Sequence, residues 1–107
     1  MAVTNIDDDI FQRLLESNTT MFIHFSATWS SPCETIVRPE FERLSNDYNG
    51  RVNFYEMDID RCSETVEKFG VRSVPSLMVF KAREMRGKSE SRAIRGAEMK
   101  KLIDRYI

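Results

Sequence analysis

The stretch "MFIHFSATWSSPC", residues 21–33, decides the fold prediction. Its first six residues, 21–26, are nearly all apolar, which is typical of a strand that is covered on both faces. Pro32 suits the first turn of a helix, where a missing N–H is not needed. Serine is favoured at a helix start, so Ser30 has a structural role available there. The stretch therefore predicts a strand that runs directly into a helix, with Ser30 and Cys33 at the junction.

The helix after this junction has one apolar stripe. Val37, Phe41, Leu44 and Tyr48 recur at helical spacing, so one face of the helix is expected to be buried. Pro39 lies inside this pattern and is expected to kink the helix.

The rest of the chain alternates in the same way. Further helices are predicted over residues 7–17, 62–69 and 97–106, and further strands over residues 52–58, 76–81 and 91–95. Strands separated by helices indicate parallel pairing, whereas the last two strands, joined by a basic loop, indicate an antiparallel hairpin. The predicted class is α/β, with a mixed central β-sheet flanked by helices on both faces.

Length and composition fit one globular unit. The chain has 107 residues, of which 41% are hydrophobic and 31% charged, so we expect a single domain over residues 1–107. It has no apolar run of the roughly 18 residues that span a bilayer, and its acidic start does not resemble a signal peptide. A cytoplasmic monomer without membrane contact is the expectation.

The charge is uneven along the chain. The net charge is −1, but the segment "KAREMRGKSESRAIR", residues 81–95, carries +4. Such a segment suits a solvated hairpin or an acidic partner. No aromatic side chains interleave with the charges, so nucleic-acid binding is not expected.

The cysteine count limits the chemistry. Cys33 and Cys62 are too few for a disulfide scaffold, and with one histidine in the chain they do not form a metal-binding pattern. No metal or other cofactor is expected. Cys62 is interpreted as a surface or half-buried thiol, and a bridge between the two cysteines is not expected.

The sequence resembles the thioredoxin family along nearly its whole length. The family's motif is Trp-Cys-Gly-Pro-Cys after a central strand, followed by a proline in the next helix. In "WSSPCETIVRP" the residues Trp29, Pro32, Cys33 and Pro39 match it. The segment "FGVRSVPSLMVFK" is similar to the family's cis-proline segment, and Pro75 would be that proline. The resemblance implies a thioredoxin fold and disulfide reduction.

The sequence departs from the family at the reacting positions. Ser30 stands where the family has its nucleophilic cysteine, and Ser31 replaces the usual glycine. The family's buried aspartate is His24 here, and its lysine partner on the neighbouring strand is Glu56. A buried polar pair is tolerated only when both partners are present. We therefore expect His24 and Glu56 to meet behind the motif, either as a structural pair or as a buried acid–base pair.

These departures limit the reaction. In the family the first cysteine attacks a disulfide as a thiolate, and the second, which is Cys33 here, releases the product. The hydroxyl of Ser30 is far less acidic than a thiol and cannot replace it. If Cys33 acted alone, release would need an external thiol, which cannot match an intramolecular attack with an effective molarity of ~10⁵ M or more. A buried Cys33 that packs as a small hydrophobe is the simpler interpretation.

The resemblance also implies a groove for extended protein segments. Trp29, Ser31, Pro32, Val74 and Pro75 would line it, with the residue before the cis-proline offering backbone hydrogen bonds. Trp29 could equally be half-buried packing.

Gly96 resembles the glycine before the family's last helix and is also assigned to the groove. Protein substrates or partners with extended segments are the expected ligands. A two-cysteine parent would in addition need a reductant of the thioredoxin-reductase type.

Three functions stay open at this point. The chain could be a disulfide reductase whose nucleophile has been replaced, in nature or by design, which leaves it inactive or severely impaired. It could be a natural redox-silent binding module that uses the groove and the basic segment 81–95. It could also be a weak monothiol redox protein that uses Cys33.

Overall fold

The computed structural model describes residues 3–90 and 95–107. The strands are β1 (Val3–Asn5), β2 (Met21–Ser26), β3 (Asn53–Asp58), β4 (Ser76–Lys81) and β5 (Glu84–Ser89). The helices are α1 (Asp8–Glu16), α2 (Arg38–Ser45), α3 (Ser63–Phe69) and α4 (Gly96–Tyr106). A π-helical segment, η1 (Cys33–Val37), leads into α2, and a 3₁₀ turn, η2 (Asn46–Tyr48), follows it.

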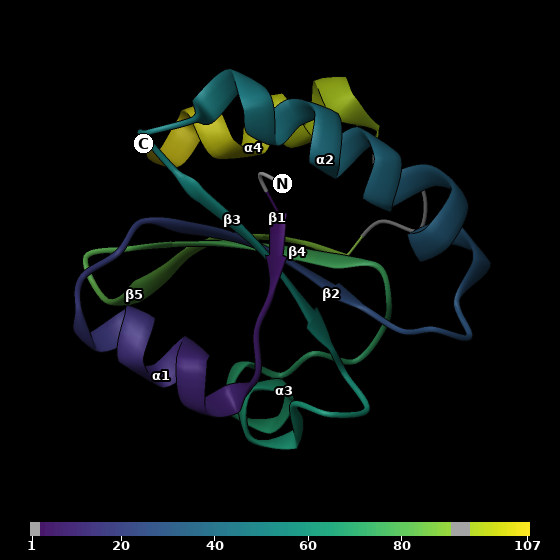
Figure 1. Ribbon diagram of the computed structural model, residues 1–107, viewed down its shortest axis with the longest axis horizontal. Coiled ribbons are helices and arrows are strands. Elements are labelled where there is room, and N and C mark those ends of the chain that lie inside the picture. Colours follow the sequence, from purple (N-terminus) through teal and green to yellow (C-terminus); the bar gives the residue numbers. More distant parts are fainter. Residues whose placement is uncertain (1–2, 91–94) are drawn as a thin grey trace.

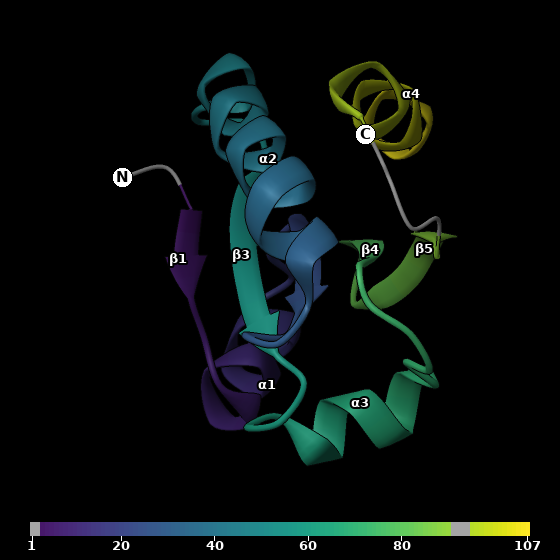
Figure 2. The ribbon, with the colours of Figure 1, turned by 90° about the vertical axis from the view of Figure 1, so that its right-hand side faces the viewer.

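The strands form one mixed sheet in the order β1-β3-β2-β4-β5. β1, β3 and β2 are parallel, whereas β4 is antiparallel to both β2 and β5. Helices α2 and α4 cover one face of the sheet, and α1 and α3 cover the other (Figures 1 and 2). The predicted class is confirmed, and the arrangement is that of a thioredoxin fold.

Strand β2 lies in the middle of the sheet and is buried along its whole length. Its side chains alternate between two cores. Phe22 joins the cluster beneath α2 and α4, whereas Ile23 and Phe25 join the cluster beneath α1 and α3. Because His24 is two residues from Phe22, it faces α2 and not α1.

The helix after β2 changes its hydrogen-bond pattern before Pro39. The N–H of Arg38 donates to the carbonyl of Cys33, five residues earlier, and regular α-helix resumes at Arg38. A proline has no N–H to donate and crowds the carbonyl four residues before it, so a wider turn accommodates it. The irregularity predicted at Pro39 therefore takes the form of a π-helical segment that contains Cys33.

The last hairpin differs from the prediction. Its second strand is β5, Glu84–Ser89, in the segment that we predicted as a loop. The connecting residues Ala82 and Arg83 both have positive φ, 54° and 64°, which is the geometry of a two-residue type I′ turn. Such turns normally carry Asn or Gly, so this sequence gives no signal for one. Of the predicted strand 91–95, residues 91–94 lie outside the described part, and Arg95 directly precedes α4.

The edge strand β1 was not predicted. It has three residues, and it pairs with β3 in parallel register, with Asn5 beside Glu56. A strand of this length has too few side chains to show an alternating pattern.

Candidate functional site

The site starts from the register of the two central parallel strands. His24 on β2 is the cross-strand neighbour of Glu56 on β3. Both side chains lie on the face that α2 covers, and His24 Nδ1 is 3.4 Å from Glu56 Oε1. The structure therefore brings together the two polar residues that the sequence predicts to meet behind the motif.

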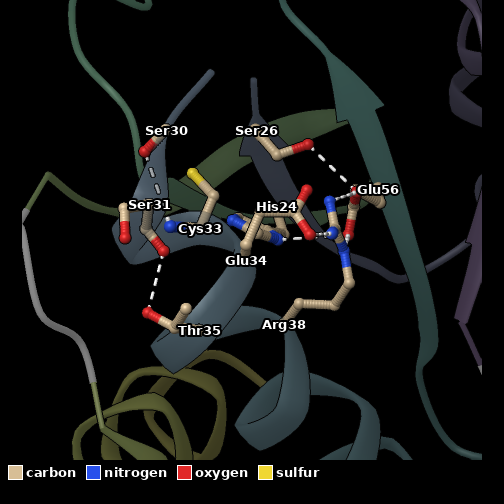
Figure 3. Close-up of polar contacts among 9 residues, drawn as sticks. All are labelled: His24, Ser26, Ser30, Ser31, Cys33, Glu34, Thr35, Arg38 and Glu56. Atoms are coloured by element: carbon tan, nitrogen blue, oxygen red, sulfur yellow. Dashed lines mark hydrogen bonds and ion pairs between the residues drawn. The ribbon is translucent and has the colours of Figure 1, made fainter. Parts of the chain in front are cut away.

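Glu56 is held from several sides (Figure 3). Arg38 donates from Nε to Oε1 at 3.1 Å and from Nη2 to Oε2 at 2.6 Å, and the Ser26 hydroxyl donates to Oε2 at 3.0 Å. Arg38 also contacts Glu34 at 2.5 Å. Burial raises the pKa of the Glu56 carboxyl, but His24 and Arg38 outweigh it and lower this pKa to about 2. Glu56 is therefore a buried anion.

His24 is less well satisfied. Its side chain has no exposed surface, and within the described residues neither ring nitrogen has a hydrogen-bond partner of normal geometry. The ring lies between Cys33 and Glu56 (Figure 3) and is tilted against the ring of Phe41, with centroids 5.7 Å apart. Burial lowers the pKa of His24, but Cys33 and Glu56 outweigh it, so this pKa lies above its ordinary value. His24 is therefore a stronger proton acceptor than a free imidazole.

Cys33 is fully buried, yet its surroundings are not simply apolar. Burial raises the pKa of the thiol, but His24, the Ser30 hydroxyl and the backbone of Ala27 outweigh it and hold this pKa below its usual value. The burial that the sequence predicts for Cys33 is confirmed, and polar groups of His24 and Ser30 lie beside its sulfur. A thiol beside an imidazole can lose its proton to the ring.

Ser30 ends the turn before the helix. It is buried, and its Oγ accepts a hydrogen bond from the Cys33 N–H at 3.5 Å, which is the arrangement of an N-cap. The Ser30 hydroxyl thus contacts the helix start and lies beside the Cys33 thiol.

Trp29 stands out from the surface beside this turn. Its side chain is 67% exposed, and Nε1 donates to Asp60 Oδ2 at 3.0 Å. The alternative of half-buried packing is wrong, because the connection after β2 turns the indole outward. A large exposed aromatic that is fixed by a hydrogen bond is suited to contact another molecule.

The other residues that the sequence assigns to a groove are placed as follows. Ser31 is exposed, and its carbonyl accepts a hydrogen bond from Thr35 Oγ1. The bond between Val74 and Pro75 is cis, and Pro75 is buried at the start of β4.

Pro32 and Gly96 are both partly buried. Gly96 begins α4, and a side chain there would lie 2.8 Å from Glu40 Oε2 and 3.0 Å from Arg43 Nη2 of α2. The ends of these two flexible side chains would have to move to admit a side chain at position 96.

Cys62 corrects the prediction of a surface or half-buried thiol. It is 1% exposed and belongs to the apolar cluster beneath α1 and α3. Burial and the carboxylates of Asp8, Asp58 and Asp7 raise the pKa of this thiol to about 11. Both cysteines are free, but their electrostatic surroundings are opposite.

Arg38 is the site residue that sequence reasoning missed. It lies on an open pocket of about 680 Å³ that Glu56 and Ser26 also line, so the buried carboxylate has a solvent-facing side. Its only sequence signal is the spacing of four residues from Glu34, and such surface pairs are common on helices.

Within residues 3–90 and 95–107, no group of three or more His, Cys, Asp or Glu side chains is arranged to hold a metal ion. In the same residues, no helix combines the length and apolar character needed to cross a membrane.

Comparisons with known proteins agree with the fold. The thioredoxin family model matches residues 2–107. Thioredoxin C-2 of Corynebacterium nephridii is 35% identical over 85 residues, which cover 78% of each chain. The thioredoxin of Staphylococcus saprophyticus is 38% identical over 81 residues, 76% of each chain. Thioredoxin M4, chloroplastic, of Arabidopsis thaliana is 31% identical over 108 residues, 100% of this chain and 55% of the relative. The chain belongs to the thioredoxin family.

Proposed function

We propose that this chain is a thioredoxin-family protein that binds extended protein segments but does not turn over as a disulfide reductase. The observation that carries the proposal is the oxygen at position 30. Ser30 occupies the place of the attacking thiol, and its hydroxyl caps the helix that carries Cys33. The other cysteine, Cys62, belongs to the core on the opposite face of the sheet and cannot substitute.

The chemistry of disulfide exchange supports this proposal. Attack requires a thiolate, and release of the mixed disulfide requires a second thiol nearby. With Cys33 alone, release depends on a thiol from solution and loses the advantage of an intramolecular attack. Cys33 is also fully buried, so a protein disulfide cannot reach its sulfur in this conformation.

The retained surface supports the binding part of the proposal. Trp29 is exposed next to the helix start, and the cis bond before Pro75 shapes the segment that leads into β4. Backbone groups at Val74 could pair with an extended segment in the manner of an added strand. None of these features needs the missing sulfur.

Reduction of a protein disulfide with dithiothreitol as electron donor tests the proposal. Insulin is a suitable substrate because its reduced chains precipitate and scatter light. The unaltered chain should produce no rate above that of dithiothreitol alone. A clear catalytic rate that scales with the concentration of the chain would contradict the proposal.

A redox-silent module that also uses the basic segment 81–95 is the second candidate. Lys81, Arg83, Arg86 and Lys88 are all exposed on the β4–β5 hairpin, which favours contact with an acidic partner. Neutralising this hairpin, as in Arg83→Gln with Lys88→Gln, should weaken such a partner's binding and leave peptide binding near Trp29 intact. Unchanged binding of an acidic probe such as heparin would exclude this candidate.

A further inference from the structure

The pair formed by Cys33 and His24 suggests a chemistry that does not need Ser30 to be a thiol. The His24 ring is completely buried, and within the described part of the chain its nitrogens lack hydrogen-bond partners of normal geometry. Glu56 is close enough to His24 for an ion pair, but a buried imidazole without a hydrogen bond of normal geometry is still costly, so its position beside a thiol needs an explanation. The ring is directed between the Cys33 side chain and Glu56 (Figure 3).

We propose that Cys33 is a thiol that hydrogen peroxide oxidises to a sulfenic acid, with His24 as the group that takes the thiol proton and returns it to the leaving oxygen. This inference goes beyond the proposed binding function and does not depend on it. The thiolate is the reactive form of cysteine, and its oxidation by peroxide yields the sulfenic acid as the first product.

The step balances within these residues and the peroxide. The Cys33 thiol gives its proton to His24, and the thiolate sulfur attacks one oxygen of hydrogen peroxide. An S–O bond forms while the O–O bond breaks, and its electron pair leaves with the second oxygen as hydroxide. His24 gives its proton to this hydroxide, which departs as water. Sulfur is oxidised by two electrons, and the peroxide is reduced by two.

The burial of Cys33 selects the oxidant. Cys33 has no exposed surface, and Ser30 above it is only 6% exposed. A protein disulfide or a bulky organic hydroperoxide would have to displace part of the chain, whereas hydrogen peroxide is scarcely larger than two water molecules. The hydroxyl of Ser30 also lies beside the thiol, where it can donate to a bound peroxide oxygen.

The charged groups around His24 favour the proton transfer. Glu56 on β3 lies 3.4 Å from Nδ1 and stabilises the imidazolium, and Arg38 on α2 keeps Glu56 ionised. On the β4 side the neighbour is the apolar Leu77, which carries no charge. The lowered pKa of the Cys33 thiol agrees with this arrangement.

The chain contains its own control for burial. Cys62 is buried as completely as Cys33, but three aspartates face it and raise its thiol pKa to about 11. Cys62 also lines the open pocket of about 680 Å³, so access alone would not favour oxidation of Cys33 over Cys62. If the neighbouring charges govern oxidation, Cys33 should react and Cys62 should not.

The experiment exposes the folded chain to hydrogen peroxide near pH 7, removes the peroxide with catalase, and then unfolds the chain in dimedone. Mass spectrometry of the digest measures the sulfenic acid at each cysteine. We expect Cys33 to be oxidised at least about tenfold faster than Cys62, because an ordinary thiol is only a few per cent ionised near pH 7 and the raised pKa of Cys62 makes it less ionised still. Equal rates, or a faster Cys62, would overturn the proposal. So would oxidation of Cys33 by cumene hydroperoxide as fast as by hydrogen peroxide.

A second variant isolates His24. In His24→Gln the oxidation rate of Cys33 near pH 7 should fall about tenfold, and its pH profile should move to that of an ordinary thiol. The matched control is Glu98→Gln, at an exposed residue of α4, which should leave the rate unchanged. If His24→Gln does not fold, the ionisation of Cys33 is measured instead in the folded Cys62→Ser variant. In this variant Cys33 is the single thiol, so the thiolate absorbance reports its ionisation alone. Ionisation of Cys33 only above about pH 8.5, the ordinary value, would overturn the proposal.

Discussion

His24 on β2 and Glu56 on β3 are register partners, and their side chains meet 3.4 Å apart on the face that α2 covers. The pairing follows from the parallel alignment of the two strands, which places both residues on one face. Arg38 on α2 donates two hydrogen bonds to the same carboxylate and so connects the helix to the sheet.

Removal of the buried carboxylate should be strongly destabilising. Glu56→Gln leaves Arg38 and His24 without their anion, and the loss of one partner from a buried pair costs about 3 kcal/mol. Urea unfolding near pH 7 measures the free energy. The matched control is Glu34→Gln, whose side chain is 45% exposed and also contacts Arg38, and it should cost less than about 1 kcal/mol. Similar losses of unfolding free energy in both variants would contradict the claim that the buried Glu56 carboxylate stabilises the fold more than an exposed one.

The same carboxylate predicts an acid limb in the stability profile. The pKa of Glu56 is about 2 in the folded chain against 4.5 for the free group. A lowered folded pKa gives stability that is present above about pH 4.5 and is lost as the pH falls towards 2. Urea unfolding across this range should therefore show a shallower acid limb in Glu56→Gln than in the unaltered chain. Parallel limbs would contradict the assigned shift.

His24 should have the opposite effect on the pH dependence of stability, because it makes the free energy of unfolding fall as the pH rises. Its pKa is raised above 6.5 by Cys33 and Glu56 against the effect of burial. A raised folded pKa gives stability that is complete below pH 6.5 and is lost as the pH rises through the folded value. NMR titration of the single histidine in the chain should show a midpoint above 6.5. A midpoint below that value would mean that burial outweighs the neighbouring charges.

Gly87 lies at a tight contact between β5 and α4. A side chain at this position would overlap the ring of Tyr106. Gly87→Ala should therefore lower the free energy of unfolding by about 1–3 kcal/mol, the usual range for overpacking. The penalty should shrink in a Tyr106→Leu background, which removes the ring. If Gly87→Ala costs the same free energy in both backgrounds, the cost arises within strand β5 and not from overlap with the Tyr106 ring.

Trp29 should contribute to peptide binding and contribute little to stability. Its side chain is 67% exposed, so Trp29→Ala should change the melting temperature little. It should nevertheless reduce the capture of extended peptides from a displayed library about tenfold or more, as expected for an aromatic at the centre of an interface. Ile10→Ala, at an exposed apolar residue on α1, is the control and should leave capture unchanged. Equal capture by Trp29→Ala and the unaltered chain would remove Trp29 from the binding surface.

The sequence predicted the central elements well because they carry dense apolar patterns. The bounds 21–26 and 76–81 agree with β2 and β4, since both strands are buried on both faces and read as continuous runs. The meeting of His24 and Glu56 could be anticipated because two polar residues in adjacent buried strands need each other.

The missed features depend on geometry that local sequence does not encode. The hairpin turn at Ala82 and Arg83 uses positive φ in residues that seldom adopt it. Cys62 follows acidic residues that suggest a surface, yet α3 folds over it. The Arg38 side chain is long enough to reach several partners, and only the packing of α2 on the sheet selects Glu56.

The loss of one sulfur, with the surrounding site retained, is the central claim, and a side-by-side rate measurement tests it most directly. Insulin reduction by dithiothreitol should be accelerated by Ser30→Cys by about a hundredfold or more over the unaltered chain, because an intramolecular second thiol is restored. Adding Cys33→Ser to that variant should abolish the gain. Rapid catalytic reduction by the unaltered chain, at a rate comparable with that of Ser30→Cys, would contradict the account.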